Sequence, residues 1–267
     1  MRHSLAVFLL LTLAACSSSS IDPKAVDQAN KVPAEELYAQ AQEAMQDGNL
    51  DKTIKTLETL QSRYPYGRYA QQAQMEIAYA YYKHEEPEAA LTAVDRFIKQ
   101  YPNSVNLDYV YYLKGLINFI DNTSFLQRLS QQDPAERDPQ SARDSFDAYR
   151  ELVTRFPDSR YAPDARVRMQ YLINILARSE IRVADYYLRR GAYIAAVNRA
   201  NSVLKEFPQT PQTRDALQIM VRAYDAMGQK DLRDDTQRVL DLNIARDGVK
   251  PGSQDASLGE KPWWRFW

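Results

Sequence analysis

The chain has 267 residues, and its 34 lysines and arginines nearly balance its 35 aspartates and glutamates, for a formal net charge of −1. This balance argues against the basic stripe with which proteins bind nucleic acids. One cysteine and two histidines argue against zinc sites built from several His and Cys and against Ser-His-Asp catalysis. The eight glycines form no Gly-rich phosphate loop, and we expect neither an enzyme nor a cofactor or metal.

The first predicted element is an export signal at the amino terminus. After a basic start, residues 5–13 form an apolar run of nine with one threonine. Two small residues, Ala14 and Ala15, follow where a signal peptidase must bind. The run is too short to span a bilayer, which needs about 20 apolar residues. We therefore interpret residues 1–15 as a signal peptide that is removed from the mature chain.

The single cysteine, Cys16, stands at the end of this signal. The sequence Leu-Ala-Ala-Cys resembles the lipobox of bacterial lipoproteins. This resemblance implies that Cys16 receives S-diacylglycerol, that the peptide is cut before Cys16 and that the new amine is acylated. Several acyl chains give stable membrane anchoring, whereas one gives only marginal binding. Ser17, in place of Asp, resembles lipoproteins exported to the outer membrane, so residues 16–32 are predicted to be a lipidated tether.

An aromatic residue followed by proline recurs along the rest of the chain. The four dipeptides are Tyr64-Pro65, Tyr101-Pro102, Phe156-Pro157 and Phe207-Pro208. Proline lacks a backbone N–H and cannot continue a helix, so each dipeptide predicts a helix stop. The first two prolines lie 37 positions apart, close to the tetratricopeptide period of about 34 residues, and the later gaps of 55 and 51 each leave room for an extra element.

Small and aromatic residues fall in the tetratricopeptide register between these stops. Small residues let paired helices approach closely, and glycine at the turn takes the left-handed conformation that ends a first helix. The matching glycines are Gly48, Gly191 and Gly228, and Thr53 stands where a small alanine is expected. In the fifth unit Arg233 stands at a small-residue position, which predicts a polar outer helix that caps the array.

These signals predict an all-α fold, a tetratricopeptide-like solenoid of five helix pairs over residues 33–245. The 164–190 stretch has no Gly or Pro and is long enough for one helix of about 40 Å. Residues 121–138 are predicted to be an insertion and residues 246–267 a flexible, tryptophan-rich tail. The expected pairs are about 33–47 with 50–64, 69–84 with 87–101, 107–120 with 139–156, 164–190 with 192–206, and 211–227 with 230–243.

The first helices of such pairs line a groove that binds partners. Ten of the 18 tyrosines fall between Tyr64 and Tyr112. Tyrosine offers a large contact area with a polar tip and little loss of entropy, which suits peptide recognition. The alternative is that the rings fill the core, which is the better interpretation for Tyr81. The positions turned toward the groove are Tyr38, Met75, Tyr79, Tyr82, Tyr109, Tyr112, Leu116 and Phe119.

Four longer stretches resemble the BamD family of lipoproteins, also called ComL. They are RYPYGRYAQQAQ (63–74), AYAYYKHEEPEAALTAVDRFIKQYP (78–102), DYVYYLKGL (108–116) and VADYYLRRGAYIAAVNRA (183–200). The resemblance covers residues 33–243. It implies a non-enzymatic subunit of the Bam machine, which folds and inserts β-barrel proteins into the outer membrane, held by its lipid on the periplasmic face.

The resemblance also implies partners. In this family the C-terminal repeats bind a POTRA domain of BamA, the N-terminal repeats are implicated in binding unfolded outer-membrane barrels, and other Bam lipoproteins lie along the domain. Asn198 and Arg199 lie on the second helix of the fourth pair, outside the small-residue positions. We expect them on the BamA side, because a guanidinium forms forked hydrogen bonds with carboxylates and carbonyls.

Other interpretations stay open from the sequence. One is a different tetratricopeptide lipoprotein, such as a pilus pilotin or an adaptor of cell-wall enzymes, and another is an enzyme carried on a helical scaffold. The 246–267 segment, with its PWWRFW sequence, departs from the family pattern. Its aromatic residues are expected to dock on the last repeat, to enter the membrane interface, to bind another Bam subunit or to occupy the chain's own groove.

Overall fold

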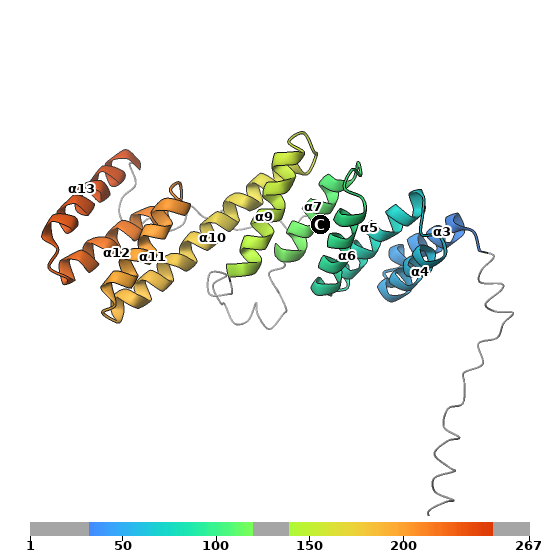
Figure 1. The fold of residues 1–267 in the computed structure, drawn as a ribbon, viewed down its shortest axis with the longest axis horizontal. Coiled ribbons are helices and arrows are strands. Elements are labelled where there is room, and N and C mark those ends of the chain that lie inside the picture. Colours follow the sequence, from blue (N-terminus) through green and yellow to red (C-terminus); the bar gives the residue numbers. More distant parts are fainter. Residues whose placement is uncertain (1–31, 120–138, 248–267) are drawn as a thin grey trace, which may run out of the picture. The chain divides into compact units, whose positions relative to one another are not determined.

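The computed structural model describes residues 32–119 and 139–247, and every regular element in these two ranges is a helix (Figure 1). The helices follow one another as five pairs, so the predicted all-α fold of tetratricopeptide-like repeats is confirmed. The chain divides into two compact units, Met1–Tyr101 and Pro102–Trp267.

Unit 1 contains two helix pairs among its described residues. The first pair is α3 (Ala34–Gln46) with α4 (Leu50–Arg63), and the second is α5 (Arg68–Lys83) with α6 (Pro87–Gln100). Each helix packs against the next along the chain, and α3 also touches α5. The larger side chains that fill the core of this unit are Leu57, Leu60, Val94 and Phe97.

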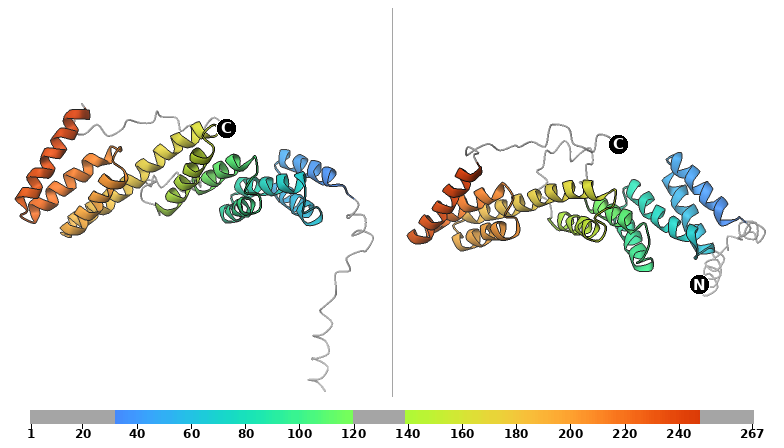
Figure 2. Two further views of the ribbon diagram at one scale, coloured as in Figure 1. Left: turned by 45° about the horizontal axis from the view of Figure 1, so that its top comes forward. Right: turned by 90° about the horizontal axis from the view of Figure 1, so that it is seen from above.

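Unit 2 contains the other three described pairs. They are α7 (Leu107–Phe119) with α9 (Pro139–Arg155), α10 (Ala162–Arg189) with α11 (Tyr193–Glu206), and α12 (Gln212–Ala226) with α13 (Lys230–Asp247). With 28 residues, α10 is long enough to pack against α9, α11 and α12 (Figure 2).

Small residues sit where paired helices touch, as the register predicts. A Cβ atom on Gly115 of α7 would lie 2.3 Å from the Tyr149 ring of α9, and Tyr149 is fully buried. The Ser145 hydroxyl donates to the Gly115 carbonyl oxygen over 2.9 Å. The Tyr149 ring therefore packs directly on the backbone of α7, and only glycine at position 115 leaves room for it. Thr53, in place of the expected alanine, is buried, and its hydroxyl donates to the Asn49 carbonyl over 2.9 Å.

Helix ends follow the predicted chemistry. Each aromatic residue of the four aromatic-Pro dipeptides directly follows the last residue of a helix, at Tyr64, Tyr101, Phe156 and Phe207. The glycines between paired helices take positive φ, with 72° at Gly48, 75° at Gly191 and 69° at Gly228. Glu85 stands at the matching turn of the second pair and takes a φ of 62°, so this turn forms without glycine.

Three predicted features lie outside the described residues: the signal peptide with Cys16, the insertion at 121–138, and the segment from 248 onward. Within 32–119 and 139–247, no helix has the length and apolar content that crossing a membrane requires. The expected polar outer face of the last helix is only partly correct, because α13 also exposes Leu232, Val239 and Leu242. That helix continues to Asp247, four residues beyond the expected end at 243.

Candidate partner-binding surfaces

A carboxylate lies at the centre of the tyrosine-rich surface of unit 1. Glu76 on α5 accepts hydrogen bonds from the Tyr38 hydroxyl over 2.5 Å, from the Gln72 amide over 2.8 Å and from the Gln42 amide. We call Tyr38, Gln42, Gln72 and Glu76 the Glu76 cluster. All three donors are uncharged, so no cation among the described residues pairs with this carboxylate, and three hydrogen bonds leave one of its roughly four acceptor sites open.

The other predicted groove residues of unit 1 lie on α5 beside this cluster. Tyr79 and Tyr82 are half-buried, and their rings lie 6.3 Å apart, so both retain exposed area for a partner. Met75 is only 8% exposed and belongs to the core of the unit. Tyr81, which was expected in the core, is half-buried, and its hydroxyl donates to the Glu58 carboxylate over 3.1 Å.

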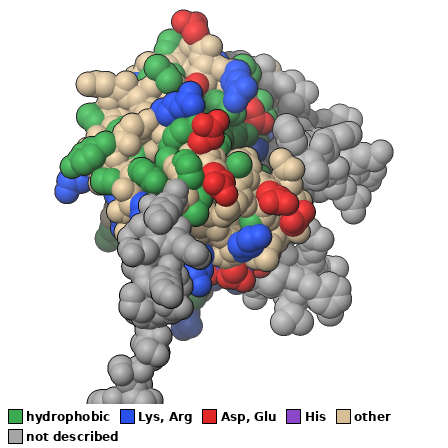
Figure 3. All heavy atoms as spheres, turned by 90° about the vertical axis from the view of Figure 1, so that its right-hand side faces the viewer, with side chains coloured by type: hydrophobic (Ala, Val, Ile, Leu, Met, Phe, Trp, Pro, Cys, Tyr) green, Lys and Arg blue, Asp and Glu red, His purple; other side chains and the backbone are tan. Residues whose placement is uncertain are grey.

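The environment of Tyr38 keeps its phenol protonated. Burial and then the hydrogen bond to the Glu76 carboxylate raise the pKa of Tyr38 well above its usual value. The ring also packs against Tyr69, with centroids 5.4 Å apart, and the Arg68 guanidinium lies 4.6 Å from the centre of the Tyr69 ring. The space-filling view from the α3 end shows hydrophobic side chains interspersed with acidic and basic ones (Figure 3). Ring area next to the Glu76 carboxylate suits an occupant that combines apolar rings with hydrogen-bond donors.

A second cluster in unit 2 has the same tyrosine–carboxylate contact and adds a cation. The Tyr112 hydroxyl on α7 donates to Asp164 over 2.7 Å, and the Arg168 guanidinium donates to the same Asp164 oxygen over 2.5 Å. The Tyr161 ring stacks on the Tyr112 ring with centroids 4.8 Å apart. We call Tyr112, Tyr161, Asp164 and Arg168 the Arg168 cluster. It joins the end of the α9–α10 turn to the middle of α7.

Arg168 is held by aromatic faces as well as by Asp164. Its side chain is 5% exposed, and its guanidinium lies within 6.0 Å of the ring centres of Tyr112, Phe119 and Tyr149. A charged group this deeply buried is stable only when it is paired and hydrogen-bonded. Burial and then the hydrogen bond to Asp164 raise the pKa of Tyr112 to about 12. The Arg168 cluster is therefore largely part of the packing of unit 2.

The remaining groove residues of α7 surround this cluster. Tyr109, Leu116 and Phe119 are all half-buried. The Tyr109 ring lies 5.6 Å from Tyr161, and the Phe119 ring meets Tyr171 edge-on at 5.7 Å. The predicted groove positions thus fall into two sets, one in each unit, and the structure brings residues together within each set.

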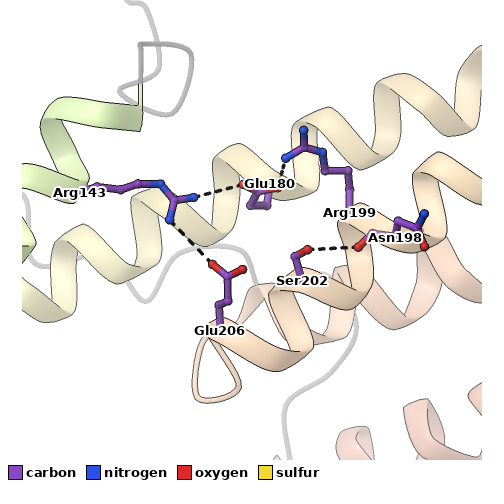
Figure 4. A network of polar contacts seen from close by, with 6 residues as sticks. All are labelled: Arg143, Glu180, Asn198, Arg199, Ser202 and Glu206. Carbon is purple, nitrogen blue, oxygen red and sulfur yellow. Dashed lines mark hydrogen bonds and ion pairs between the residues drawn. The ribbon is translucent and has the colours of Figure 1, made fainter.

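The predicted BamA-side residues lie on α11, next to an ion-pair network (Figure 4). Arg199 donates to the Glu180 carboxylate over 3.1 Å, and Arg143 approaches the other Glu180 oxygen at 3.4 Å. Arg143 also reaches Glu206 at 3.8 Å. The side chain of Glu180 is 12% exposed and that of Arg199 is 48% exposed, so a nearly buried carboxylate holds a half-exposed guanidinium. Asn198 is exposed, and its backbone carbonyl oxygen accepts a hydrogen bond from the Ser202 hydroxyl over 3.2 Å.

Apart from Arg199, sequence reasoning missed the charged members of these surfaces. Asp164 and Arg168 are spaced i,i+4 on an uninterrupted helix, which is a readable sign of an ion pair. Glu76 gave no such sign, because its partner Tyr38 lies 38 positions away on another helix. Glu180 could not be identified from the sequence for the same reason, because its partners Arg199 and Arg143 lie on two other helices.

Comparison with known proteins agrees with this architecture and with the resemblance read from the sequence. The family model for YfiO, an outer membrane lipoprotein, matches residues 30–240. The outer membrane protein assembly factor BamD of Neisseria meningitidis serogroup B is 41% identical over 265 residues, 98% of both chains. The BamD protein of Vibrio cholerae serotype O1 is 38% identical over 234 residues, 88% of this chain and 95% of that protein.

Among solved structures, the likeness is weaker. A crystal structure of the MamA protein covers 84% of this chain and 96% of its own, with 15% sequence identity and a TM-score of 0.34. A TM-score this low gives no support to any assignment of fold. The family match spans most of the chain, and the relatives are aligned along nearly their whole length. The chain therefore belongs to the BamD family of outer membrane lipoproteins.

Proposed function

We propose that this chain is an outer membrane protein assembly factor, a non-enzymatic scaffold that brings unfolded barrel proteins to the Bam machine. The observation that carries the proposal is the 41% identity to a BamD protein over 98% of both chains. The helix pairs support it, because arrays of this type act by presenting binding surfaces. The mechanism is recruitment and positioning of partners, without bond chemistry.

The direct test is recovery of partners from detergent-solubilised membranes with a tagged, full-length chain. We expect BamA and other Bam lipoproteins to co-purify. Recovery of a secretin or a cell-wall hydrolase without BamA would overturn the proposal in favour of another lipoprotein adaptor. A hydrolase activity of the purified chain that is lost when one carboxylate is replaced would overturn its non-enzymatic part.

Membrane attachment is proposed to depend on lipid at Cys16. The lipobox cysteine is the only thiol in the chain, and stable attachment needs more than one acyl chain. A Cys16→Ser variant should accumulate in the soluble periplasm or as uncleaved precursor. Fractionation that finds this variant in the outer membrane at the normal level, without precursor, would contradict the lipid anchor.

The surface proposed to receive unfolded barrel proteins includes Tyr38, Tyr79 and Tyr82. The rings of Tyr79 and Tyr82 are half-buried and adjacent, and Glu76 places an acceptor next to Tyr38. An extended chain with an aromatic end can pack on such rings while its backbone N–H groups face the hydroxyls and the carboxylate. In unit 2 the half-buried Tyr109, Leu116 and Phe119 are proposed to contribute a second set of contacts, with Tyr112 beside them held by Asp164.

Replacing Tyr79 and Tyr82 with alanine tests the unit 1 surface. Each lost aromatic contact should cost about 0.5–1.5 kcal/mol beyond the buried area, so crosslinking to peptides that end like barrel strands should weaken. Tyr66→Ala is the control, because Tyr66 lies in the same unit and is 90% exposed. A large drop in melting temperature with unchanged binding per folded molecule would show that the two rings act in the core.

Arg199 is proposed to contact BamA. Glu180 holds one edge of its guanidinium at 3.1 Å, and the side chain remains 48% exposed, so the group is oriented and still accessible to an acidic partner. Arg199→Glu should reduce BamA recovery by more than any loss of thermal stability explains, because Arg143 still pairs with Glu180 and keeps that carboxylate partnered. Arg189→Glu is the matched control, since Arg189 also pairs within unit 2, with Asp185 at 3.0 Å. Equal BamA recovery by both variants would contradict the proposed contact.

A further inference from the structure

The outer side of α13 carries an apolar stripe. Leu232, Val239 and Leu242 are 47%, 47% and 70% exposed. Their spacing, i, i+7 and i+10, spreads them over about 80° around the helix axis, so they share one face. Asp235 lies on the same face, between Leu232 and Val239 in the sequence, and pairs with Arg238. The stripe is therefore an apolar face that includes one ion pair.

The side of α13 next to the stripe already packs against another helix. Thr236 and Leu240 are buried. In the described part of the chain, α12 is the helix against which α13 packs, and α13 lies at the edge of unit 2 (Figure 2). A capping helix of a repeat array is soluble when its outer face is polar. The stripe departs from that rule, and an occupant would remove its apolar area from water.

We propose that the stripe is covered by the chain's own Trp263–Trp267 segment. Residues 248–262 separate α13 from this segment. A random coil of 15 residues has a root-mean-square span of roughly 19–23 Å. Along α13, Leu242 and Leu232 lie about 8 Å and about 22 Å from the helix end at 1.5 Å per residue. The tether therefore spans a distance that matches the stripe, which makes the local concentration of the segment high.

The chemistry of the segment complements that of the stripe. Trp263, Trp264, Phe266 and Trp267 supply four aromatic rings, with Arg265 among them. The rings can cover the three aliphatic side chains while the guanidinium reaches the carboxylate of Asp235. The side chains of Arg238 and Asp235 are 75% and 66% exposed, so the Asp235 carboxylate can accept a second guanidinium beside Arg238.

Tryptophan fluorescence tests this proposal directly, because all three tryptophans of the chain lie in the segment. The sample is the mature chain with Cys16→Ser, which needs no detergent and keeps every described residue. We expect blue-shifted emission and protection from acrylamide, compared with a free peptide of residues 248–267. Both properties should be independent of protein concentration, because the contact is within one chain.

A matched pair of substitutions locates the contact. Leu242→Gln should shift the emission to the red and increase quenching, whereas Ile194→Gln on α11 should change neither. Leu242 and Ile194 are both 70% exposed and lie in the same unit, so the two changes remove similar apolar area. Neither side chain is in the core, and circular dichroism should show both variants fully folded.

Three outcomes would overturn the proposal. A water-exposed spectrum in the parent chain that turns blue only with phospholipid vesicles would assign the segment to the membrane interface. A blue shift that disappears on dilution would assign the stripe to a second copy of the chain. A blue spectrum that Leu242→Gln leaves unchanged would place the tryptophans elsewhere.

Discussion

Unit 1 and unit 2 present the same contact, a tyrosine hydroxyl on a carboxylate, in two different settings. Among residues 32–119 and 139–247, the carboxylate of the Glu76 cluster is held by neutral donors alone. In the Arg168 cluster the carboxylate also meets a guanidinium that is 5% exposed and surrounded by rings. The first arrangement leaves a negative charge at the surface, and the second neutralises it within the unit.

This difference teaches that a tyrosine-rich face is not one functional surface. Where a buried cation is present, the rings around it serve packing, because an uncompensated charge in the interior is costly. Where the acceptor has neutral donors only, the rings beside it remain available to a partner. We therefore expect substitutions in the Arg168 cluster to act on stability and those around the Glu76 cluster to act on binding.

The largest effect is expected from Arg168→Met. The change leaves Asp164 without its cation and removes the guanidinium from three ring faces. Breaking a buried pair from one side costs about 3–5 kcal/mol, and because Asp164 is 43% exposed we expect the low end, roughly 3 kcal/mol. Denaturant unfolding measures the loss, with exposed Arg166→Met as control. A loss equal to that of the control would remove the distinction between the two clusters.

Gly115→Ala should rank second and should also act on unit 2. The added Cβ would meet the buried Tyr149 ring at 2.3 Å, and such overpacking costs about 1–3 kcal/mol. Alanine is favoured over glycine in a helix by about 1 kcal/mol, so a net loss of about 0–2 kcal/mol remains, and the 2.3 Å contact with a fully buried ring favours the upper end. In a double variant with Tyr149→Leu, the losses of unfolding free energy from the two single changes should not add, because leucine removes the ring that the new methyl group meets. Hydrogen exchange in α7 and α9 should increase while exchange in α3 and α5 stays the same.

Alkaline pH should weaken the Tyr112 contact. The pKa of a tyrosine in an unfolded chain is about 10. In the folded chain, burial and the hydrogen bond to Asp164 raise the pKa of Tyr112 to about 12. Because the folded state binds this proton more tightly, the stabilisation is fully present below pH 10 and is lost as pH rises toward 12. Urea midpoints across this range should fall less steeply for Tyr112→Phe than for the parent chain. Parallel curves would mean that the contact contributes no pH dependence.

Glu76→Gln should have the smallest effect on stability. The amide keeps one acceptor for Tyr38 or Gln72 and removes the charge, so we expect a change below about 1 kcal/mol, the scale of one net hydrogen bond. Binding of peptides that end like barrel strands should nevertheless weaken if the carboxylate faces the occupant. A stability loss as large as that of Arg168→Met would make the two clusters equivalent and contradict the comparison.

The helix pairs were predictable from sequence because their signals are local. The aromatic-Pro stops, the absence of Gly and Pro in 164–190 and the glycines at the turns each act within a few residues. The clusters were not predictable, because Tyr112 and Asp164 are 52 positions apart and meet only after α7 and α10 pack. Helix periodicity placed Met75 on the side of Tyr79, but it does not specify depth, and Met75 is buried where Tyr79 is half-exposed.

The length of α10 has a consequence for how unit 2 unfolds. In a repeat array each helix pair touches only its neighbouring pairs, so different parts of the array can unfold one after another. The first half of α10 carries Asp164 and Arg168 against α7, and its second half packs Ala177 and Ala184 in a core with Ala196 and Ala200 of α11. One continuous rod of 28 residues, about 42 Å long, thus belongs to two adjacent pairs at once. Loss of structure in one pair would remove the packing of one half of α10 and weaken the other half, so we expect the middle of unit 2 to unfold cooperatively.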